Sequence, residues 1–155
     1  MTDLAIRVAA AATLIWLGMV LAISFLEAPL KFRADGLELR VGLAIGRIVF
    51  RALNIAEVIW AVVIAICLTI AGPSGPVLVL AAVTAVLLAV QLLVVRPRLN
   101  RRSARVLAGQ EAPRSRAHHA YIGLEALKLA ALVALGAGPP VGMTIPATTH
   151  VGEVT

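Results

Sequence analysis

Pro76 to Val95 reads PVLVLAAVTAVLLAVQLLVV, a run of 20 residues that contains no charged side chain and a single amide, Gln91. A helix of this length rises about 30 Å, which matches the hydrocarbon thickness of a lipid bilayer. A helix also satisfies its own backbone polar groups, as lipid requires. The stretch therefore predicts a membrane-spanning helix.

Three further apolar runs along the chain are also long enough to cross a bilayer. Together with the first run they predict spans at about 5–26, 51–71, 76–95 and 118–136. Of the 155 residues, 61% are hydrophobic and 14% are charged, which excludes an ordinary water-soluble domain. We predict an all-α fold in which residues 1–155 form one integral membrane bundle of four transmembrane helices, with no separate soluble catalytic module.

The connections between these spans differ in charge. The turn at 72–76 carries no charge, whereas residues 27–40 carry both acids and bases. The segment 96–117 holds seven of the 14 basic residues: Arg96, Arg98, Arg101, Arg102, Arg105, Arg114 and Arg116. Because basic loops stay in the cytoplasm, we expect a basic cytoplasmic loop at 96–117, both termini outside (N-out/C-out), and a multi-pass protein of the cell membrane. We expect anionic lipid headgroups at this loop, and no nucleic acid despite the net charge of +6.

A cleaved signal peptide is the competing interpretation of the first apolar run, with Arg7 as its basic flank. The apolar stretch Val8–Leu26 is longer than the usual core of a signal peptide, and no clean small-x-small cleavage motif closes it. We therefore interpret this run as the first span.

Residues 41–50 precede the second span and are largely apolar as well, so we expect a helical extension or a segment at the membrane interface. Gly42 and Gly46 in this segment form a G-x-x-x-G, a spacing that lets helices approach closely. Their face is one hypothetical interface of a homo-oligomer.

Polar side chains within the spans are costly in lipid, so we expect them to face the bundle interior and to serve a purpose there. Two sets recur every three or four residues, each on one face of its helix. The candidate ligand-binding residues are Arg51, Asn54 and Glu57 on the second span, and His118, Tyr121, Glu125 and Lys128 on the fourth. At 1.5 Å per residue, both glutamates lie roughly 10 Å from the cytoplasmic boundary. Gln91 and Arg96 on the third span, and Ser24 and Glu27 on the first, fall toward the same end, which predicts a polar vestibule facing the cytoplasm.

The charged residues of this vestibule allow two interpretations. In the first interpretation, two acids and two bases neutralise one another and fix the packing of the helices. These residues are Arg51, Glu57, Glu125 and Lys128. In the second, the vestibule binds a small ion or polar solute, with the glutamates as proton or cation sites and the bases as counter-charges.

We predict no metal site, no cofactor and no catalytic residues. His118 and His119 are adjacent, so their side chains diverge by about 100° on a helix, and His150 lies in the external tail. The single cysteine, Cys67, forms neither an intrachain disulfide nor a thiolate cage. No Ser-His-Asp set, P-loop or dinucleotide fingerprint is present, which leaves an intramembrane enzyme as the third interpretation.

Two short segments carry a family resemblance: SFLEAPLKF at 24–32, and GRIVFRALN at 46–54 with Glu57 beyond it. They resemble the bacterial form of the transmembrane-protein-205-like family of small four-helix membrane proteins, over about a third of the chain. An Ala-Pro that ends the first span and a Gly-x-x-Phe that enters the second recur in that family. They correspond here to Ala28-Pro29 and to Gly46 with Val49 or Phe50. The resemblance implies a four-span fold and no settled biochemical activity.

Taken together, the patterns favour an integral membrane protein that binds or moves a small ion or polar solute through its cytoplasm-facing polar cluster, in a transport or resistance role. The alternative is a non-catalytic accessory or assembly subunit of a larger membrane complex. In that case the partner is another membrane protein or a second copy of the chain, and the charged residues serve helix packing.

Overall fold

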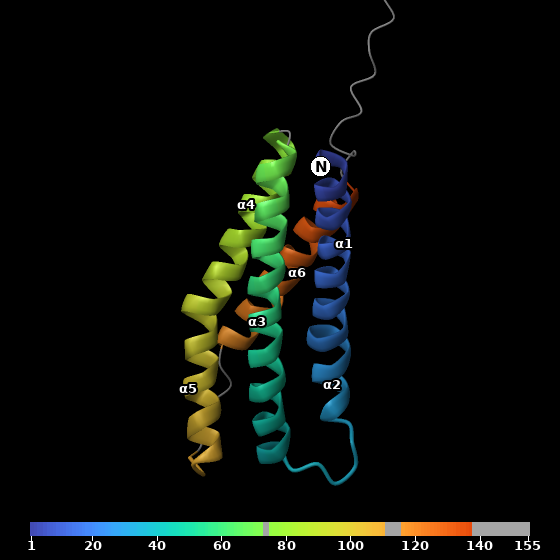
Figure 1. The fold of residues 1–155 in the computed structure, drawn as a ribbon. Coiled ribbons are helices and arrows are strands. Elements are labelled where there is room, and N and C mark those ends of the chain that lie inside the picture. Colours follow the sequence, from blue (N-terminus) through green and yellow to red (C-terminus); the bar gives the residue numbers. More distant parts are fainter. Residues whose placement is uncertain (73–74, 111–115, 138–155) are drawn as a thin grey trace, which may run out of the picture.

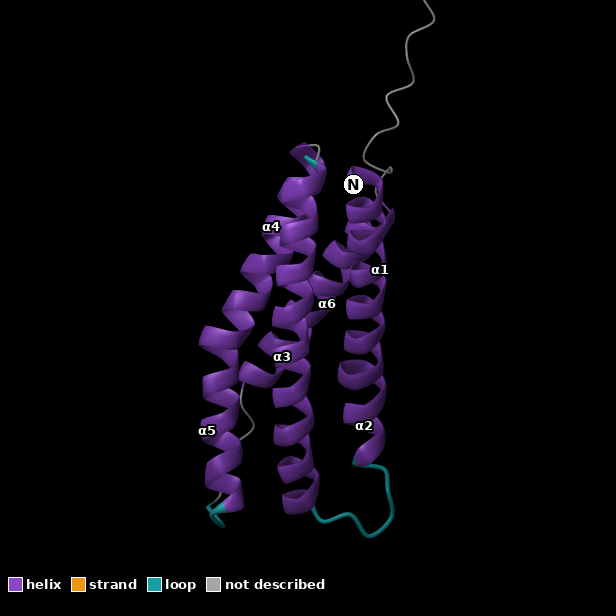
Figure 2. Ribbon diagram, viewed as in Figure 1, coloured by secondary structure: helices purple, strands orange, loops and turns teal. Residues whose placement is uncertain are grey.

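The structure, a computed structural model, describes residues 1–72, 75–110 and 116–137, with the side chains of 116–118 left aside. Its elements are all helices (Figure 1). In chain order they are α1 (Thr2–Val20), a π-helical segment (Leu21–Glu27), α2 (Ala28–Lys31), α3 (Leu39–Ala71), α4 (Gly75–Val90), a second π-helical segment (Gln91–Val95), α5 (Arg96–Leu107) and α6 (Arg116–Ala137). Figure 2 shows that the described part of the chain contains no strand.

These elements join into four long rods, each with an apolar window long enough to cross a bilayer: Thr2–Lys31, Leu39–Ala71, Gly75–Leu107 and His119–Ala137. Large aliphatic side chains cover their outer faces, where Ile48 is 72% and Leu93 is 76% exposed. Such a surface is stable against acyl chains rather than water. The predicted all-helical bundle with four membrane-spanning helices is thus confirmed, and the chain is a multi-pass membrane protein in contact with the lipid bilayer.

An apolar core joins the rods in the half of the bundle nearer the Gly72 turn. Its buried members come from α1, α3, α4 and α6: Ala12, Trp16, Val20, Ile64, Leu68, Val77, Leu88 and Leu132. Figure 1 shows α6 crossing obliquely behind the other rods, where it contacts α1 and α4. α3 ends at Gly72, whose φ of 64° lies in the left-handed region that glycine adopts without strain.

The basic segment differs from the loop that we expected at 96–117. Residues 96–107 form α5, which continues the third rod beyond the predicted span 76–95. Arginine, leucine and alanine are good helix formers, and Pro97 lies in the first turn, where its missing N–H removes the least hydrogen bonding. The arginines from 96 to 105 therefore lie on α5, whereas Arg114 lies outside the described residues.

The first two rods are also longer than the predicted spans 5–26 and 51–71. They run from Thr2 to Lys31 and from Leu39 to Ala71, so residues 41–50 are a helical extension of α3. The additional turns carry charged side chains, which hydropathy counting excluded from the spans although they continue the same helices.

Both π-helical segments directly precede a proline in the next helical turn. The N–H of Ala28 bonds the carbonyl of Ile23, five residues back, and the N–H of Arg96 bonds that of Gln91 in the same way. Pro29 and Pro97 follow, and a proline ring clashes with the carbonyl four residues earlier in a regular α-helix. Widening the turn to a five-residue bond relieves that clash, and it also changes the direction in which the preceding side chains point.

Candidate functional site

Lys128 of α6 lies at the centre of a polar cluster inside the bundle. Its Nζ donates to Oε1 of Glu57 on α3, to Oε1 of Gln91 at 2.8 Å and to Oε2 of Glu125 at 3.0 Å. The side chain of Lys128 is 0% exposed, and both carboxylates are almost as completely buried. An ammonium group has three N–H donors, so these three acceptors saturate it.

The first rod completes the cluster through an indole and a hydroxyl. Trp16 Nε1 donates to Glu57 Oε1 at 3.1 Å, and Ser24 Oγ donates to Glu125 Oε1 at 2.8 Å. Gln91 Nε2 also donates to Glu125 Oε2. All four rods therefore contribute to one hydrogen-bonded network, and each carboxylate accepts from at least two different elements.

Arg96 supplies the second buried cation. Its guanidinium carbon lies 4.4 Å from the ring centroid of Phe50 and 4.7 Å from that of Tyr121, and its Nη2 donates to the Tyr121 hydroxyl at 2.9 Å. The guanidinium lies in the corner between two rings whose planes are 84° apart, and this contact partly replaces the water that a buried guanidinium loses. The two buried carboxylates and the two buried cations balance, and Tyr121 Oη, 3.3 Å from Glu125 Oε1, links the arginine to the rest of the cluster.

The two glutamates occupy corresponding places in the two halves of the chain. Glu57 lies 28 residues after Pro29, and Glu125 lies 28 residues after Pro97. Each proline follows a π-helical segment, and each glutamate sits on the rod that comes next. The first and second rods thus bring Glu57, and the third and fourth rods bring Glu125, to the same depth in the bundle, with Lys128 between the two carboxylates.

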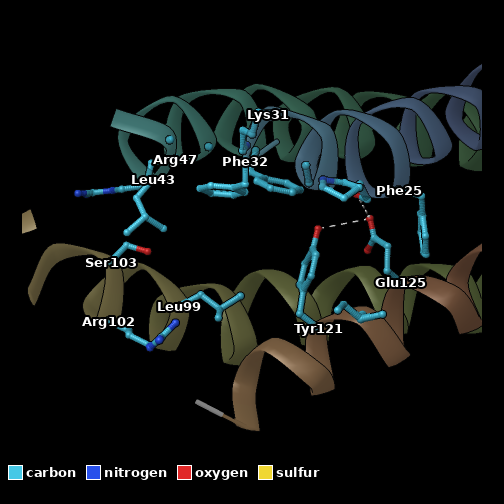
Figure 3. A pocket seen from close by; sticks show the side chains of 17 residues that line it. Phe25, Lys31, Phe32, Leu43, Arg47, Leu99, Arg102, Ser103, Tyr121 and Glu125 are labelled. Carbon is cyan, nitrogen blue, oxygen red and sulfur yellow. Dashed lines mark hydrogen bonds between the residues drawn. The ribbon is translucent and has the colours of Figure 1, made fainter. Parts of the chain in front are cut away.

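A cavity of about 450 Å³ opens beside this cluster, between α2 and α3 on one side and α5 and α6 on the other (Figure 3). Tyr121 and Glu125 line one end of it, together with Ser24, which bonds Glu125, whereas Arg47, Arg102 and Ser103 lie toward the opposite end. The walls between these ends are mainly apolar and aromatic: Phe25, Pro29, Phe32, Leu43, Phe50, Leu99 and Ile122. This size and mixture are typical of sites for small organic ligands.

Gly42 and Gly46 also line this cavity, and the same chain covers their face. A β-carbon at position 42 would lie 2.5 Å from Cε1 of Phe32, and one at position 46 would lie 3.0 Å from Nζ of Lys31. The G-x-x-x-G therefore accommodates Lys31 at the end of α2 and Phe32 directly after it. It does not present the open face to a second copy that we hypothesised from the sequence.

The structure brings four of the seven predicted site residues together: Glu57, Tyr121, Glu125 and Lys128. Arg51 and Asn54 lie elsewhere, in a groove between α3 and α5. Six residues separate Arg51 from Glu57, which turns their side chains about 120° apart around the helix axis, so the stripe is wider than one face. The side chain of His118 lies outside the described part of the chain.

Arg96, not Arg51, supplies the second base of the buried set. Gln91, Ser24 and Arg96 had been placed at the correct end of the bundle, but their direct contacts depend on the π-helical turns, which hydropathy does not report. Trp16 was missed, because a single tryptophan within an apolar helix looks like core packing. The signal that could have found it is an indole N–H in a buried position, which needs an acceptor.

Within the described residues, no three histidine, cysteine, aspartate or glutamate side chains come together as a metal-ligand set. The polar cluster can hold and exchange hydrogen bonds, and the cavity beside it can admit a solute. No family model, no curated protein and no solved structure matches the chain, so the chemistry of the site follows from its own residues.

Proposed function

We propose that this membrane protein binds a small organic solute in the cavity between α2, α3, α5 and α6, with Glu125 as its polar anchor. The observation that carries the proposal is the position of Glu125, which belongs to the buried cluster and also lines the cavity. Its partner Glu57 is bonded to the same ammonium group but does not line the cavity. A solute that hydrogen-bonds Glu125 would thereby alter the hydrogen-bonded network that joins all four rods.

The lining of the cavity supports an elongated, amphipathic solute. Its middle is aromatic and apolar, its inner end offers carboxylate and hydroxyl oxygens, and its outer end carries the guanidinium of Arg47. Lys31 at the wall is already ion-paired with Glu27 at 3.2 Å. The matching solute has an apolar body, a hydrogen-bond donor at one end and an acidic group at the other.

The arrangement supports binding more directly than transport. The half of the bundle beyond the cluster is filled by the apolar core, in which Trp16, Val20 and Leu132 are at most 2% exposed. A solute that crossed the membrane would have to separate these side chains. We therefore propose binding as the first event, and any movement of the solute across the membrane would follow it.

Thermal unfolding of the purified protein in detergent, with a panel of aromatic and aliphatic carboxylic acids that carry a distal hydroxyl or amino group, tests the proposal. A ligand that binds the folded state raises the melting temperature by mass action. We expect Glu125→Gln to remove this rise and Glu57→Gln to keep it, because both lose one buried charge but only Glu125 faces the cavity. Leu43→Trp, which fills the cavity without touching the cluster, should remove the rise as well.

A ligand-induced rise that survives both Glu125→Gln and Leu43→Trp would place the ligand elsewhere and overturn the proposal. If no member of the panel shifts the melting temperature, solutes of this class are not the ligand.

The second candidate function is an accessory or assembly subunit. It is favoured by the hydrogen bonding of the cluster, which leaves few polar atoms free for a ligand. Among the buried side-chain nitrogens and oxygens that the structure describes, Arg96 Nε is the one without a hydrogen-bond partner. Under this hypothesis the cluster fixes helix packing and the partner is another membrane protein. Affinity purification from native membranes separates the two, because an assembly role predicts a stoichiometric partner that Glu125→Gln releases.

We also propose that α5 faces the cytoplasm in the cell membrane, as the arginines between 96 and 105 favour, and that the chain is a distant relative of the transmembrane-protein-205-like family. A cysteine placed at Arg101 in a Cys67→Ala background tests the orientation. An impermeant maleimide should label it only after the membrane is opened.

A further inference from the structure

A second cavity lies outside the cluster, and Arg47 is the one residue that its lining shares with the proposed solute site. It has a volume of about 500 Å³ and separates α3 from α5. Its polar lining consists of Arg47 and Arg51 on α3, with Asn54 beside them, and of Asn100 on α5. Ile48 and Leu107 supply apolar walls. We define this set as the α3–α5 groove.

The charge of the α3–α5 groove is entirely positive. No carboxylate lines it, and neither Arg47 nor Arg51 forms an ion pair with any residue that the structure describes. Two guanidinium groups one helical turn apart present planar N–H forks on one face of α3. Such forks match the oxygens of a phosphate group, and the two amides add further donors.

The depth of the groove matches the headgroup region of a membrane. Arg51 lies 21 residues before Gly72, the end of α3, so the helix rises about 30 Å between them. That rise equals the thickness of the hydrocarbon layer, which puts Arg51 at its boundary. From Arg51 toward Gly72, α3 continues with exposed Ile55 and Ile59, which are 56% and 54% exposed and follow at four-residue spacing.

We propose that the α3–α5 groove binds the phosphate of an anionic membrane lipid, whose acyl chain lies along the exposed isoleucines of α3. A basic end joined to an apolar helix face complements an amphiphile with an anionic head and a hydrocarbon tail. The positive lining favours an anionic lipid over a zwitterionic one, whose choline or ethanolamine would meet two arginines. Free phosphate shares the headgroup chemistry but leaves the apolar face unused.

The test compares phosphatidylglycerol, phosphatidylcholine and inorganic phosphate as additives to the full-length protein in detergent, with thermal stability and native mass spectrometry as readouts. We expect phosphatidylglycerol to bind and to raise the melting temperature, and the other two to do so far less. Arg51→Gln should weaken the apparent affinity for phosphatidylglycerol by about tenfold or more. Arg101→Gln is the matched control, because this arginine is exposed on α5 outside the groove and its loss changes the net charge equally.

Equal binding of phosphatidylglycerol and phosphatidylcholine would overturn the proposal, and so would an equal loss in Arg51→Gln and Arg101→Gln, which would indicate unspecific attraction. A stabilisation by inorganic phosphate as large as that by phosphatidylglycerol would assign the groove to a free anion and overturn the lipid as its source. Should Arg51→Gln not fold, Asn100→Ala removes a donor from the other side of the groove and is expected to weaken binding in the same direction. Arg51 and Asn100 do not line the cavity at Glu125. The effect of replacing them on lipid binding therefore tests the groove independently of the proposed solute site.

Discussion

Lys128 and Glu57 form an ion pair that water does not reach, although 71 positions separate them in the chain. The lysine carries the only ammonium group in contact with both buried carboxylates among the described residues. Coulombic attraction inside a low-dielectric bundle is strong, but it has to offset the loss of hydration of every charge involved. Removing one member is therefore more damaging than removing the whole set.

Lys128→Met tests this asymmetry. The substitution leaves two carboxylates buried side by side without their shared cation, and we expect a loss of about 3–5 kcal/mol in the free energy of unfolding. Lys31→Met is the control, because its partly exposed pair with Glu27 should contribute less than about 1 kcal/mol. Unfolding in mixed detergent micelles measures both. If Glu57→Gln and Glu125→Gln, added to Lys128→Met, fail to recover stability, the loss does not arise from uncompensated charge.

Trp16→Phe removes the indole donor while keeping an aromatic ring in the core. Because Trp16 Nε1 donates to the buried carboxylate of Glu57, we expect a loss of about 2 kcal/mol. Trp60→Phe is the matched variant, since its Nε1 meets the sulfur of Met19, a weak acceptor, and it should cost less than about 1 kcal/mol. Equal losses in the two variants would show that ring volume, not the hydrogen bond, determines the effect.

Arg96→Lys keeps the charge and removes the guanidinium that contacts both Phe50 and Tyr121 and donates to the Tyr121 hydroxyl. A lysine ammonium lacks this broad fork of N–H donors and cannot make all three contacts, so we expect a loss of about 1–2 kcal/mol. Arg98→Lys, an exposed change two residues further along α5, should leave the melting temperature unchanged. Near-ultraviolet circular dichroism reports the Tyr121 environment in the same samples. A spectrum unaltered by Arg96→Lys would argue against the contact between Arg96 and Tyr121.

Gly42→Val distinguishes an intrachain contact from an interface between copies. The new side chain would press on Phe32 and Leu37, and we expect a loss of about 1–2 kcal/mol with an unchanged crosslinking pattern in native membranes. Gly18→Val controls for the cost of a β-branched residue in a helix, because the space around position 18 is open. A selective loss of crosslinked dimer at Gly42→Val would restore the oligomer hypothesis.

Hydropathy alone predicted the four-helix membrane fold, because apolar length is a property of each segment by itself. The helical extension over 41–50 was one of the two expected alternatives and is observed, whereas the third rod continues as α5 through charged residues that we expected in a loop. Helical spacing correctly grouped Tyr121, Glu125 and Lys128, which lie within two turns of one helix. It failed for Arg51, whose angular offset from Glu57 accumulates over six residues.

The contacts between rods could not be predicted in this way. The rotation of each rod about its own axis determines that Trp16 faces Glu57 and that Arg96 lies over the ring of Phe50. Small apolar residues pack in several rotations, so the sequence leaves this rotation undetermined. The two prolines carried usable information: each implies a disturbed turn, and the side chains just before such a turn leave the regular helical period.

The π-helical turns also determine which changes in chain length the protein tolerates. A π turn holds one residue more than an α turn, so deleting one residue between Gln91 and Val95 would return the third rod to a regular helix without rotating the residues after it. Arg96 would keep its place beside Phe50 and Tyr121, and the cost would be the clash of the Pro97 ring with the carbonyl four residues before it. Deleting a residue from the regular part of α4 would instead rotate everything after it by about 100°. Single-residue deletions are therefore expected in the two short stretches before Pro29 and Pro97, and not in the regular turns beside them, in any descendant of this chain that keeps the buried cluster.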